Sequence, residues 1–285
     1  MIEVEGLTFR YQGAARPSVR AVSFTVPKGH VFGILGPSGA GKSTLQRLMI
    51  KLLPVQEGAI RYEGRGIGEL GRDFFARVGV SFEHPNLFPR LSARENLTCL
   101  LGLYGGRPHD DPDALLAAVG LGGAAERPAG ECSKGMKQRL VFLRALIHRP
   151  EILFLDEPTS GLDPASAEQV KAVVRERVSR GVTVILTTHT MTLADELCDT
   201  VAFIHDGALA AIGSPRELKL RHGERSVRIE RRVEGRLATE VFGLEGEDER
   251  ARLGAALAAP GIETVHSQEA TLEAVFLRLT GRALA

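Results

Sequence analysis

A glycine-rich loop near the amino end limits this chain of 285 residues to a small set of folds. The run before it, HVFGILG at residues 30–36, is apolar at nearly every position, which is typical of a strand buried on both faces. A helical pattern follows over residues 42–53. The order strand, loop, helix predicts one compact unit. Its loop and first helical residues are Gly36, Pro37, Ser38, Gly39, Ala40, Gly41, Lys42, Ser43 and Thr44.

This loop has the composition of a polyphosphate site. Its glycines leave backbone N–H groups open to an anion because no Cβ stands in the way, and the following helix adds the positive end of its dipole. The spacing of a glycine, four residues and then Gly-Lys-Ser predicts that Lys42 pairs with β- and γ-phosphate oxygens. The hydroxyl of Ser43 would be a ligand of Mg²⁺.

Two adjacent acids follow a second buried strand pattern, ILFLDE at residues 152–157. The strand brings Asp156 and Glu157 to its carboxyl end, where α/β sheets bind ligands. Because successive side chains of a strand point to opposite sides, we expect Asp156 to hold Mg²⁺ through water and Glu157 to act as a general base on the attacking water. An isolated acid pair often only caps the next element, but beside the glycine loop it indicates phosphate chemistry.

The other patterns predict an α/β fold. Buried strand patterns at residues 182–189 and 199–207 follow a helix that begins at Pro164, and this alternation indicates a parallel sheet covered on both faces. Residues 2–9 and 20–26 are rich in β-formers. Between residues 84 and 150 helical patterns dominate, which predicts a helical insertion; they cover residues 92–103, 112–119 and 133–148.

The pattern changes again near residue 215. Residues 226–233 alternate with period two, residues 247–258 are helical, residues 261–267 are strand-like and residues 269–281 are helical. We therefore predict one domain over residues 1–215 and a small α+β domain over residues 216–285.

Charge and cysteine content exclude several classes of protein. The formal charge is +1, with no basic arm, which argues against a nucleic acid partner. The longest uncharged stretch, residues 181–194, is shorter than the about 20 apolar residues of a membrane span.

Three cysteines without CxxC spacing predict buried, reduced thiols rather than disulfides or zinc. The acidic start does not resemble a secretory signal, so we expect a cytoplasmic protein.

Taken in order, the motifs resemble the nucleotide-binding subunit of ATP-binding-cassette (ABC) transporters over about residues 1–215. The resemblance implies a P-loop ATPase with an antiparallel β subdomain and a helical subdomain, which binds ATP and Mg²⁺. The tail is similar to the C-terminal domain of bacterial drug- and natural-product-export ATPases. The motifs are Tyr11, the glycine loop, SFEHPNLFPRLSARENL, CSKGMKQRL, the two acids, SGLD at residues 160–163, and Thr188-His189.

The resemblance assigns roles to residues outside the glycine loop. Tyr11, with Val19 beside it, matches the aromatic residue that stacks on adenine, although core packing is the alternative for a lone tyrosine near a strand end. Glu83 stands where the family usually has a glutamine that touches Mg²⁺ and the membrane partner; it keeps an oxygen but adds a charge. His189 matches a histidine that contacts the γ-phosphate and supports Glu157.

The segment CSKGM, residues 132–136, stands where the family has its signature, usually Leu-Ser-Gly-Gly-Gln. Ser133 is expected to cap a helix whose N-terminus suits an anion, and Gly135 permits close approach. Lys134 departs from the family pattern, as does Met136, and Lys134 would either contact the γ-phosphate or lie in solvent. Asp163 matches the loop that links two sites across a dimer, and by itself it indicates an N-cap before Pro164.

One chain does not need two such helix ends for one phosphate tail. The resemblance therefore implies a two-fold dimer in which each signature closes over the ATP of the partner. It further implies an ATPase that powers transport, in the direction of export, through a separately encoded membrane permease, and that lies peripherally on the inner face of the cell membrane. The alternatives are a soluble ABC ATPase acting on ribosomes or DNA, which carries additions absent here, and a regulatory module, which Glu157 and His189 disfavour.

Overall fold

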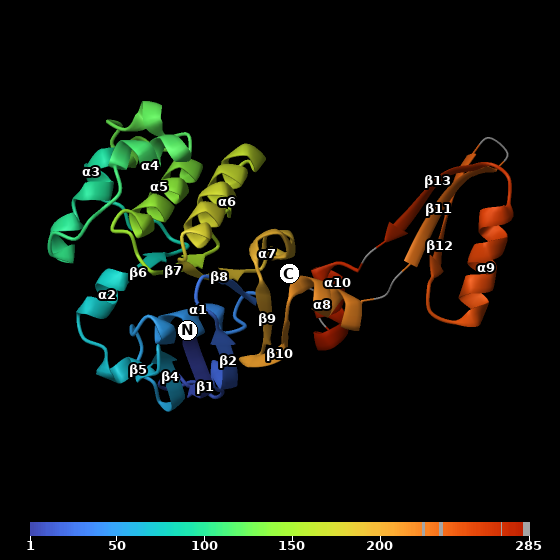
Figure 1. Ribbon diagram of the computed structural model, residues 1–285, viewed down its shortest axis with the longest axis horizontal. Coiled ribbons are helices and arrows are strands. Elements are labelled where there is room, and N and C mark those ends of the chain that lie inside the picture. The colour runs from blue at the N-terminus through green and yellow to red at the C-terminus, as the bar shows by residue number, and fades with distance from the viewer. Residues whose placement is uncertain (224–225, 234–235, 269, 282–285) are drawn as a thin grey trace. The chain divides into compact units, whose positions relative to one another are not determined.

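The structure, a computed structural model, describes residues 1–223, 226–233, 236–268 and 270–281 (Figure 1). Contacts divide the chain into two units, the first ending at Ile212 and the second starting at Gly213. This division lies three residues before the boundary predicted at residue 215. Glu269 and residues 282–285, which belong to the predicted helical tail and small domain, lie outside the described residues.

The first unit contains a four-stranded antiparallel sheet in the order β2-β1-β4-β5. In the central strand Val4 lies opposite Phe24 on one side and Ile60 on the other, and all three side chains are buried. The two β-rich segments at the amino end were predicted, whereas β4 and β5 were not, because both are short and carry few β-branched residues. The strands are β1 Ile2–Phe9, β2 Val19–Val26, β4 Glu57–Tyr62 and β5 Arg65–Gly66.

A six-stranded sheet in the order β10-β9-β3-β8-β7-β6 forms the centre of the same unit. The ladders joining β9, β3, β8, β7 and β6 are parallel, which confirms the predicted parallel sheet. Two strands of this sheet were not predicted: β6 has only four residues, and β10 consists mostly of alanine and glycine, which are depleted in strands. The strands are β3 Val31–Leu35, β6 Val78–Ser81, β7 Ile152–Asp156, β8 Thr183–Thr188, β9 Thr200–His205 and β10 Ala208–Gly213.

Helices cover both faces of this sheet. Leu45 and Leu48 of α1 (Lys42–Met49) share one core with Phe32 of the parallel sheet and with the buried face of the antiparallel sheet. Three more helices pack on strands of the parallel sheet: α5 (Lys134–Leu146), α6 (Pro164–Ser179) and α7 (Met191–Leu197). The helix α1 ends at Met49 rather than at residue 53, because Lys51 has a φ of 62° in the left-handed region.

The regular elements within residues 84–150 are helices and 3-10 turns, as predicted. The first of them, α3 (Ala93–Thr98), begins with a capping box in which Ser92 and Glu95 bond each other's backbone N–H. The predicted helix over residues 92–103 is broken, since α3 is followed by a separate 3-10 turn at Leu101–Tyr104. The insertion also contains α4 (Pro112–Ala118), and short 3-10 turns lie at Gly122–Ala124 and Ala129–Glu131. Two short elements precede the insertion: a 3-10 turn at Ile67–Glu69 and the helix α2 (Asp73–Arg77).

In its described residues, the second unit combines a small sheet with three helices. Its antiparallel sheet has the order β12-β11-β13, and Ile229 and Phe242 of the sheet form a small core with Ala256 of α9. Two further helices, α8 and α10, pack on each other. The elements are α8 Pro215–His222, β11 Ser226–Val233, β12 Arg236–Gly243, α9 Glu247–Ala258, β13 Ile262–Gln268 and α10 Leu272–Thr280.

Cys132 and Cys198 are buried free thiols, as expected, but Cys99 is exposed because it stands at the C-terminal end of α3. No helix within the described residues is both long and apolar enough to cross a membrane.

His148, which follows α5, is a buried titratable group. It is 4% exposed, its ring stacks on that of Tyr104 with centroids 4.1 Å apart, and its Nε2 lies 3.1 Å from the carbonyl oxygen of Val78. Because this oxygen only accepts, Nε2 carries the hydrogen. Burial lowers the pKa of His148 below its usual 6.5, so the folded chain holds the ring neutral.

We expect His148 to make the first unit less stable in acid. Below pH 6.5 the unfolded chain binds a proton that the folded chain excludes. The free energy of unfolding therefore decreases as the pH is lowered through this value, and the full stability is present above it. Urea unfolding at about pH 7.5 and about pH 5.5 measures the loss. His148→Phe keeps a stacked ring without titration, and it should lose less stability over this interval than the wild type. Equal losses would show that His148 does not contribute.

Candidate active site

The phosphate loop between β3 and α1 requires glycine at two positions. A Cβ on Gly36 would lie 2.2 Å from the carbonyl oxygen of Ile204. Gly41, the N-cap of α1, has a φ of 106°, and a Cβ there would lie 2.3 Å from the carbonyl oxygen of Ser18. Neighbouring backbone therefore selects these two glycines, while Ser38 and Gly39 are exposed at the tip of the loop.

Lys42 is folded back against this loop. Its side chain is 9% exposed, and Nζ donates to the carbonyl oxygens of Gly36 at 2.7 Å and Pro37 at 3.0 Å. Burial lowers the pKa of Lys42, and the charges of Glu157, Asp156 and Glu83 oppose that shift. The ammonium group is thus placed at the loop, within electrostatic reach of the predicted acids.

The acid pair stands where β7 ends. Asp156 and Glu157 are 7% and 6% exposed. The hydroxyl of Thr187 on β8 donates to Oδ1 of Asp156 at 2.5 Å, while burial, the larger effect, raises the pKa of Asp156. These contacts arise because β7 and β8 are parallel and in register, with Asp156 opposite Thr187.

Both carboxylate oxygens of Glu157 have partners at the carboxyl end of β8, in its last residue and in the residue that follows. Oε2 accepts from the hydroxyl of Thr188 at 2.9 Å, and Oε1 accepts from the backbone N–H of His189 at 2.8 Å. Nδ1 of His189 lies 2.6 Å from Oε1, so the ring donates through Nδ1. The predicted base and the predicted histidine therefore contact each other directly, and the side chain of His189 is 49% exposed.

The backbone of Glu157 is strained and held from two sides. Its φ of 47° lies in the left-handed region, which is uncommon for a residue with a side chain. Its N–H donates to the carbonyl oxygen of Thr187 at 3.0 Å, and its own carbonyl oxygen accepts from Nε2 of Gln138 on α5 at 3.4 Å. These bonds hold the backbone of Glu157 in this conformation.

The predicted metal ligands supply only oxygen donors. Ser43 is exposed in the first turn of α1, and Glu83 is exposed just after β6. The charge of Glu83 raises the pKa of both Lys42 and Asp156, so Glu83 lies within electrostatic reach of both groups. Among the described residues no group of three or more His, Cys, Asp or Glu could hold a metal. Mg²⁺ needs no such cage, because one or two carboxylates, waters and substrate phosphates suffice.

Two buried polar atoms beside these ligands have no hydrogen-bond partner in the described part of the chain. They are Nε2 of Gln46 and Oγ of Ser81. Oε1 of Gln46 lies 3.5 Å from the hydroxyl of Thr187, the same group that bonds Asp156. Unpaired buried polar atoms call for a partner, and the water shell of a hydrated cation would supply one. The residues present therefore fit Mg²⁺.

Tyr11 lies next to the phosphate-loop helix. Its ring meets that of Phe9 edge-on, with centroids 4.9 Å apart, and its hydroxyl is 3.3 Å from Oγ1 of Thr44. The ring is half-buried and packs against the core, so part of it remains open. Val19 is only 1% exposed, and its side chain supports the core instead of lining an open surface.

The signature residues open the helix α5. Ser133 is its N-cap and accepts from the N–H of Met136 at 3.2 Å, as predicted. Lys134 is exposed. A Cβ on Gly135 would lie 3.5 Å from the side chain of Leu162, so the signature is adjacent to the loop that precedes Asp163. The hydrogen bonds described for Ser133 and Gly135 stay within the helical insertion and do not reach the phosphate loop.

Asp163 is the N-cap of α6, as its sequence position indicated. Its carboxylate accepts from the N–H of Ser166 at 2.9 Å and from the hydroxyl of Ser166 at 2.7 Å. These bonds lower the pKa of Asp163.

Three residues of the site were missed by sequence reasoning. Gln46 lies one turn after Lys42 on the same buried face of α1, and this spacing was the one available signal. Thr187 and Gln138 act on the acid pair from other elements, and their local sequence does not mark them.

Comparison with known proteins assigns the family. A family model described as ABC transporter matches residues 19–160. The fluoroquinolones export ATP-binding protein of Mycobacterium tuberculosis strain CDC 1551 / Oshkosh is 49% identical over 285 residues, which cover 100% of this chain and 94% of that protein. A solved structure of an ATP-binding subunit of an ABC transporter is similar with a TM-score of 0.70 and 27% identity, over 78% of this chain and 93% of that chain.

A second solved structure shares the fold. It is a dimeric post-hydrolysis state of an ATP-binding cassette bound to ADP and Pi, with a TM-score of 0.67 and 24% identity over 75% of this chain and 98% of that chain. These similarities favour a transporter subunit over an ATPase that acts on ribosomes or DNA. The chain belongs to the ATP-binding, ATP-hydrolysing subunits of ABC transporters.

Proposed function

We propose that this subunit hydrolyses Mg-ATP as a two-fold dimer and drives export through a separately encoded membrane permease. The observation that carries the proposal is the acid pair at the end of β7, buried beside the lysine of the phosphate loop and held by three consecutive residues at the carboxyl end of β8. The relative with an export name matches along the whole chain, which supports export as the direction.

Each residue of the site has a role in hydrolysis. Lys42 would exchange its two carbonyl partners for phosphate oxygens, and the ring of Tyr11 would stack on the adenine. Ser43, Asp156 and Glu83 would hold Mg²⁺, which neutralises phosphate charge when bound. Glu157 would take a proton from water as the oxygen attacks the γ-phosphorus and the bond to ADP breaks.

The dimer would complete the site. The N-terminus of the 13-residue helix α5, with exposed Ser133 and Lys134, presents unpaired N–H groups and a positive charge. Because Ser133 and Gly135 have no described bond to their own phosphate loop, a second copy is the natural donor of ATP. Asp163 follows Leu162, which lies next to Gly135 of the signature. A movement of the signature on closure of the dimer would therefore reach Asp163 through Leu162.

A groove beside the insertion supports docking of a cytoplasmic segment of the permease. Its volume is about 360 Å³, and its lining includes Phe75 of α2 and Leu103, which are 47% and 79% exposed. Arg144 of α5 also lines it and donates to the carbonyl oxygen of Asn86 at 2.7 Å. Asn86 stands in the loop of residues 83–91, so the groove and Glu83 are joined by a few residues. Exposed large apolar side chains in a groove indicate a protein partner.

The double variant Phe75→Glu with Leu103→Glu tests this function. It should keep the basal ATPase activity within about twofold and reduce co-purification with the membrane protein of the adjacent reading frame at least about tenfold, since two charges would be desolvated in the contact. ATP-driven uptake of a fluoroquinolone into inverted vesicles should fall with it. Leu52→Glu, at an apolar residue 57% exposed outside the groove, is the control. Full recovery of the complex, or loss of basal activity, would contradict the docking site.

Residues 1–215 then form the ATPase domain, and residues 216–285 form an accessory domain without a ligand of its own. We place the subunit at the membrane as a peripheral protein held by the permease.

A further inference from the structure

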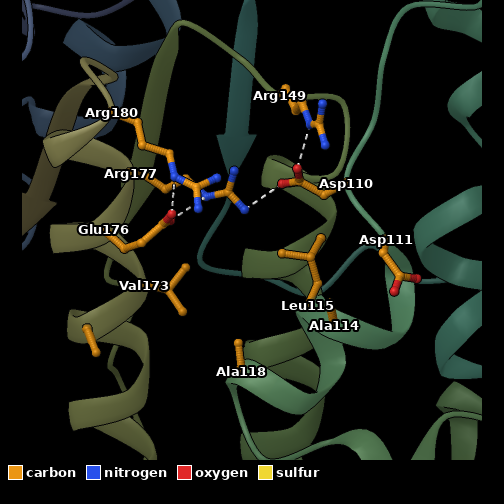
Figure 2. Close-up of a pocket in the computed structure, with 11 residues that line it drawn as sticks. Asp110, Asp111, Ala114, Leu115, Ala118, Arg149, Val173, Glu176, Arg177 and Arg180 are labelled. Atoms are coloured by element: carbon orange, nitrogen blue, oxygen red, sulfur yellow. Dashed lines mark hydrogen bonds and ion pairs between the residues drawn. The ribbon is translucent and has the colours of Figure 1, made fainter.

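A second cavity, of about 570 Å³, lies between α4 and α6 in the first unit, and none of its lining residues belongs to the nucleotide site (Figure 2). One part of its wall is apolar. Figure 2 shows Val173 of α6 facing Leu115 across the gap, with Ala118 of α4 at one end. Ala114 and Ala172 add small side chains to the same wall. This size is typical of pockets for small organic ligands.

The other part of the wall is a chain of ion pairs. Asp110 is 8% exposed and lies between two arginines, with Oδ1 accepting from Nε of Arg149 at 2.6 Å and Oδ2 lying 2.5 Å from Nη2 of Arg177. Arg177 is itself 8% exposed, and its Nε lies 3.3 Å from Oε2 of Glu176. Glu176 in turn pairs with Arg180 one turn along the helix. The charged groups are therefore built into the wall and not simply spread over the surface.

These ion pairs leave hydrogen bonding incomplete. In the described part of the chain seven buried side-chain polar atoms make no hydrogen bond, and three of them are here: Oδ2 of Asp110, Oε1 of Glu176 and Nε of Arg177. Each is near an opposite charge but is not aligned with it as a hydrogen bond. The two carboxylate oxygens already lie in ion pairs with Arg177 and Arg180. Nε of Arg177 is the one donor among the three atoms, and an acceptor group of a ligand would satisfy it.

The groups of this wall that can still form hydrogen bonds are mainly guanidinium N–H donors. A guanidinium group has five N–H donors, and the contacts described for Arg149 and Arg180 engage only Nε of each. The charges of Asp110 and Glu176 are already paired, since each of their carboxylate oxygens lies in an ion pair with an arginine. Asp111 caps α4 by accepting from the N–H of Asp113. The cavity therefore favours an anion over a cation.

We propose that this cavity binds a small amphipathic anion, a carboxylate carried on an apolar chain. The carboxylate would bond the Nη groups of Arg149 and Arg180, with Arg177 behind them, and the chain would lie along Leu115 and Val173. Arg149 and α4 belong to the helical insertion of residues 84–150, whereas α6 packs on the parallel sheet. The bound anion would therefore tie the insertion to the sheet.

Titration calorimetry of the full-length protein with decanoate, below its micelle concentration, tests the proposal. Decanoate should bind at one site. Decanol keeps the chain without the charge, acetate keeps the charge without the chain, and decyltrimethylammonium reverses the charge; each should bind at least about tenfold more weakly, which corresponds to about 1.4 kcal/mol. Equal affinity for decanol or for the cation would overturn the assignment of an anion site.

Variants locate the binding site. Ala118→Phe and Ala172→Phe place rings into the cavity from exposed helix positions, and each should weaken decanoate binding at least about tenfold by occupying its volume. Ala117→Phe, on the same helix but outside the lining, should bind as the wild type does. Arg180→Gln, at a side chain 66% exposed, should weaken decanoate but not decanol. Unchanged ATP affinity in all four variants shows that they fold. Decanoate binding that none of the cavity variants alters would overturn the proposal.

Discussion

Glu157→Gln should lower the rate of ATP hydrolysis about 10²- to 10⁴-fold while ATP still binds. Glutamine keeps the size of the side chain and an oxygen that accepts from the backbone N–H of His189, but it cannot take a proton from water. The phosphate loop is untouched, so ATP affinity should remain near that of the wild type. Phosphate release measures the rate, and size-exclusion chromatography with ATP should show an accumulating dimer, because closed sites no longer reopen.

The matched control for this variant is Glu151→Gln. Glu151 stands immediately before β7, at the opposite end of the strand from Glu157, and it pairs with Arg77 at 2.8 Å. This exposed pair is worth little, so Glu151→Gln should hydrolyse ATP at the wild-type rate. Phosphate release near the wild-type rate in Glu157→Gln would remove Glu157 from the role of general base.

Lys42→Ala should weaken ATP binding itself, by about 10- to 100-fold, because a hydrogen bond to a charged group contributes about 1.5–3 kcal/mol. The ammonium group is already placed against the loop, so little rearrangement precedes its contact with phosphate. Calorimetry with ATP measures the affinity.

Lys51→Ala is the control for Lys42→Ala. It also removes a lysine that donates to a backbone carbonyl oxygen, but one outside the phosphate loop. Nζ of Lys51 also donates to a carbonyl oxygen, that of Leu70 at 2.5 Å, but it stands after α1 and away from the phosphate loop. This variant should cost stability and leave ATP affinity unchanged. Unchanged affinity in Lys42→Ala would show that the loop is not the phosphate site.

Elements with long, regular patterns were predictable. The strand β7 and the helix α6 were predicted nearly to the residue, because a continuous apolar run and a proline at the first helical turn are strong local signals. The strand β6 has four residues and α1 stops before its apolar pattern does, and here local sequence failed. Packing against neighbouring strands decides such short elements.

The sequence by itself determined the parts of the site that are close along the chain. The strand, loop and helix around Lys42 are contiguous, and Ser133 and Asp163 cap helices through N–H groups three residues away. Contacts of this kind depend on local backbone geometry, which residue type and spacing specify.

Only the tertiary structure decided how distant residues meet. Glu157 is held by Thr188 and His189, which follow it by 31 and 32 residues, and the register of β7 against β8 brings them together. Asp110 meets Arg149 across 39 residues to form the wall of the second cavity. In each of these pairs, the sequence around one residue does not indicate which residue it will contact. Pairing in parallel sheets and between helices is set by packing of the whole core.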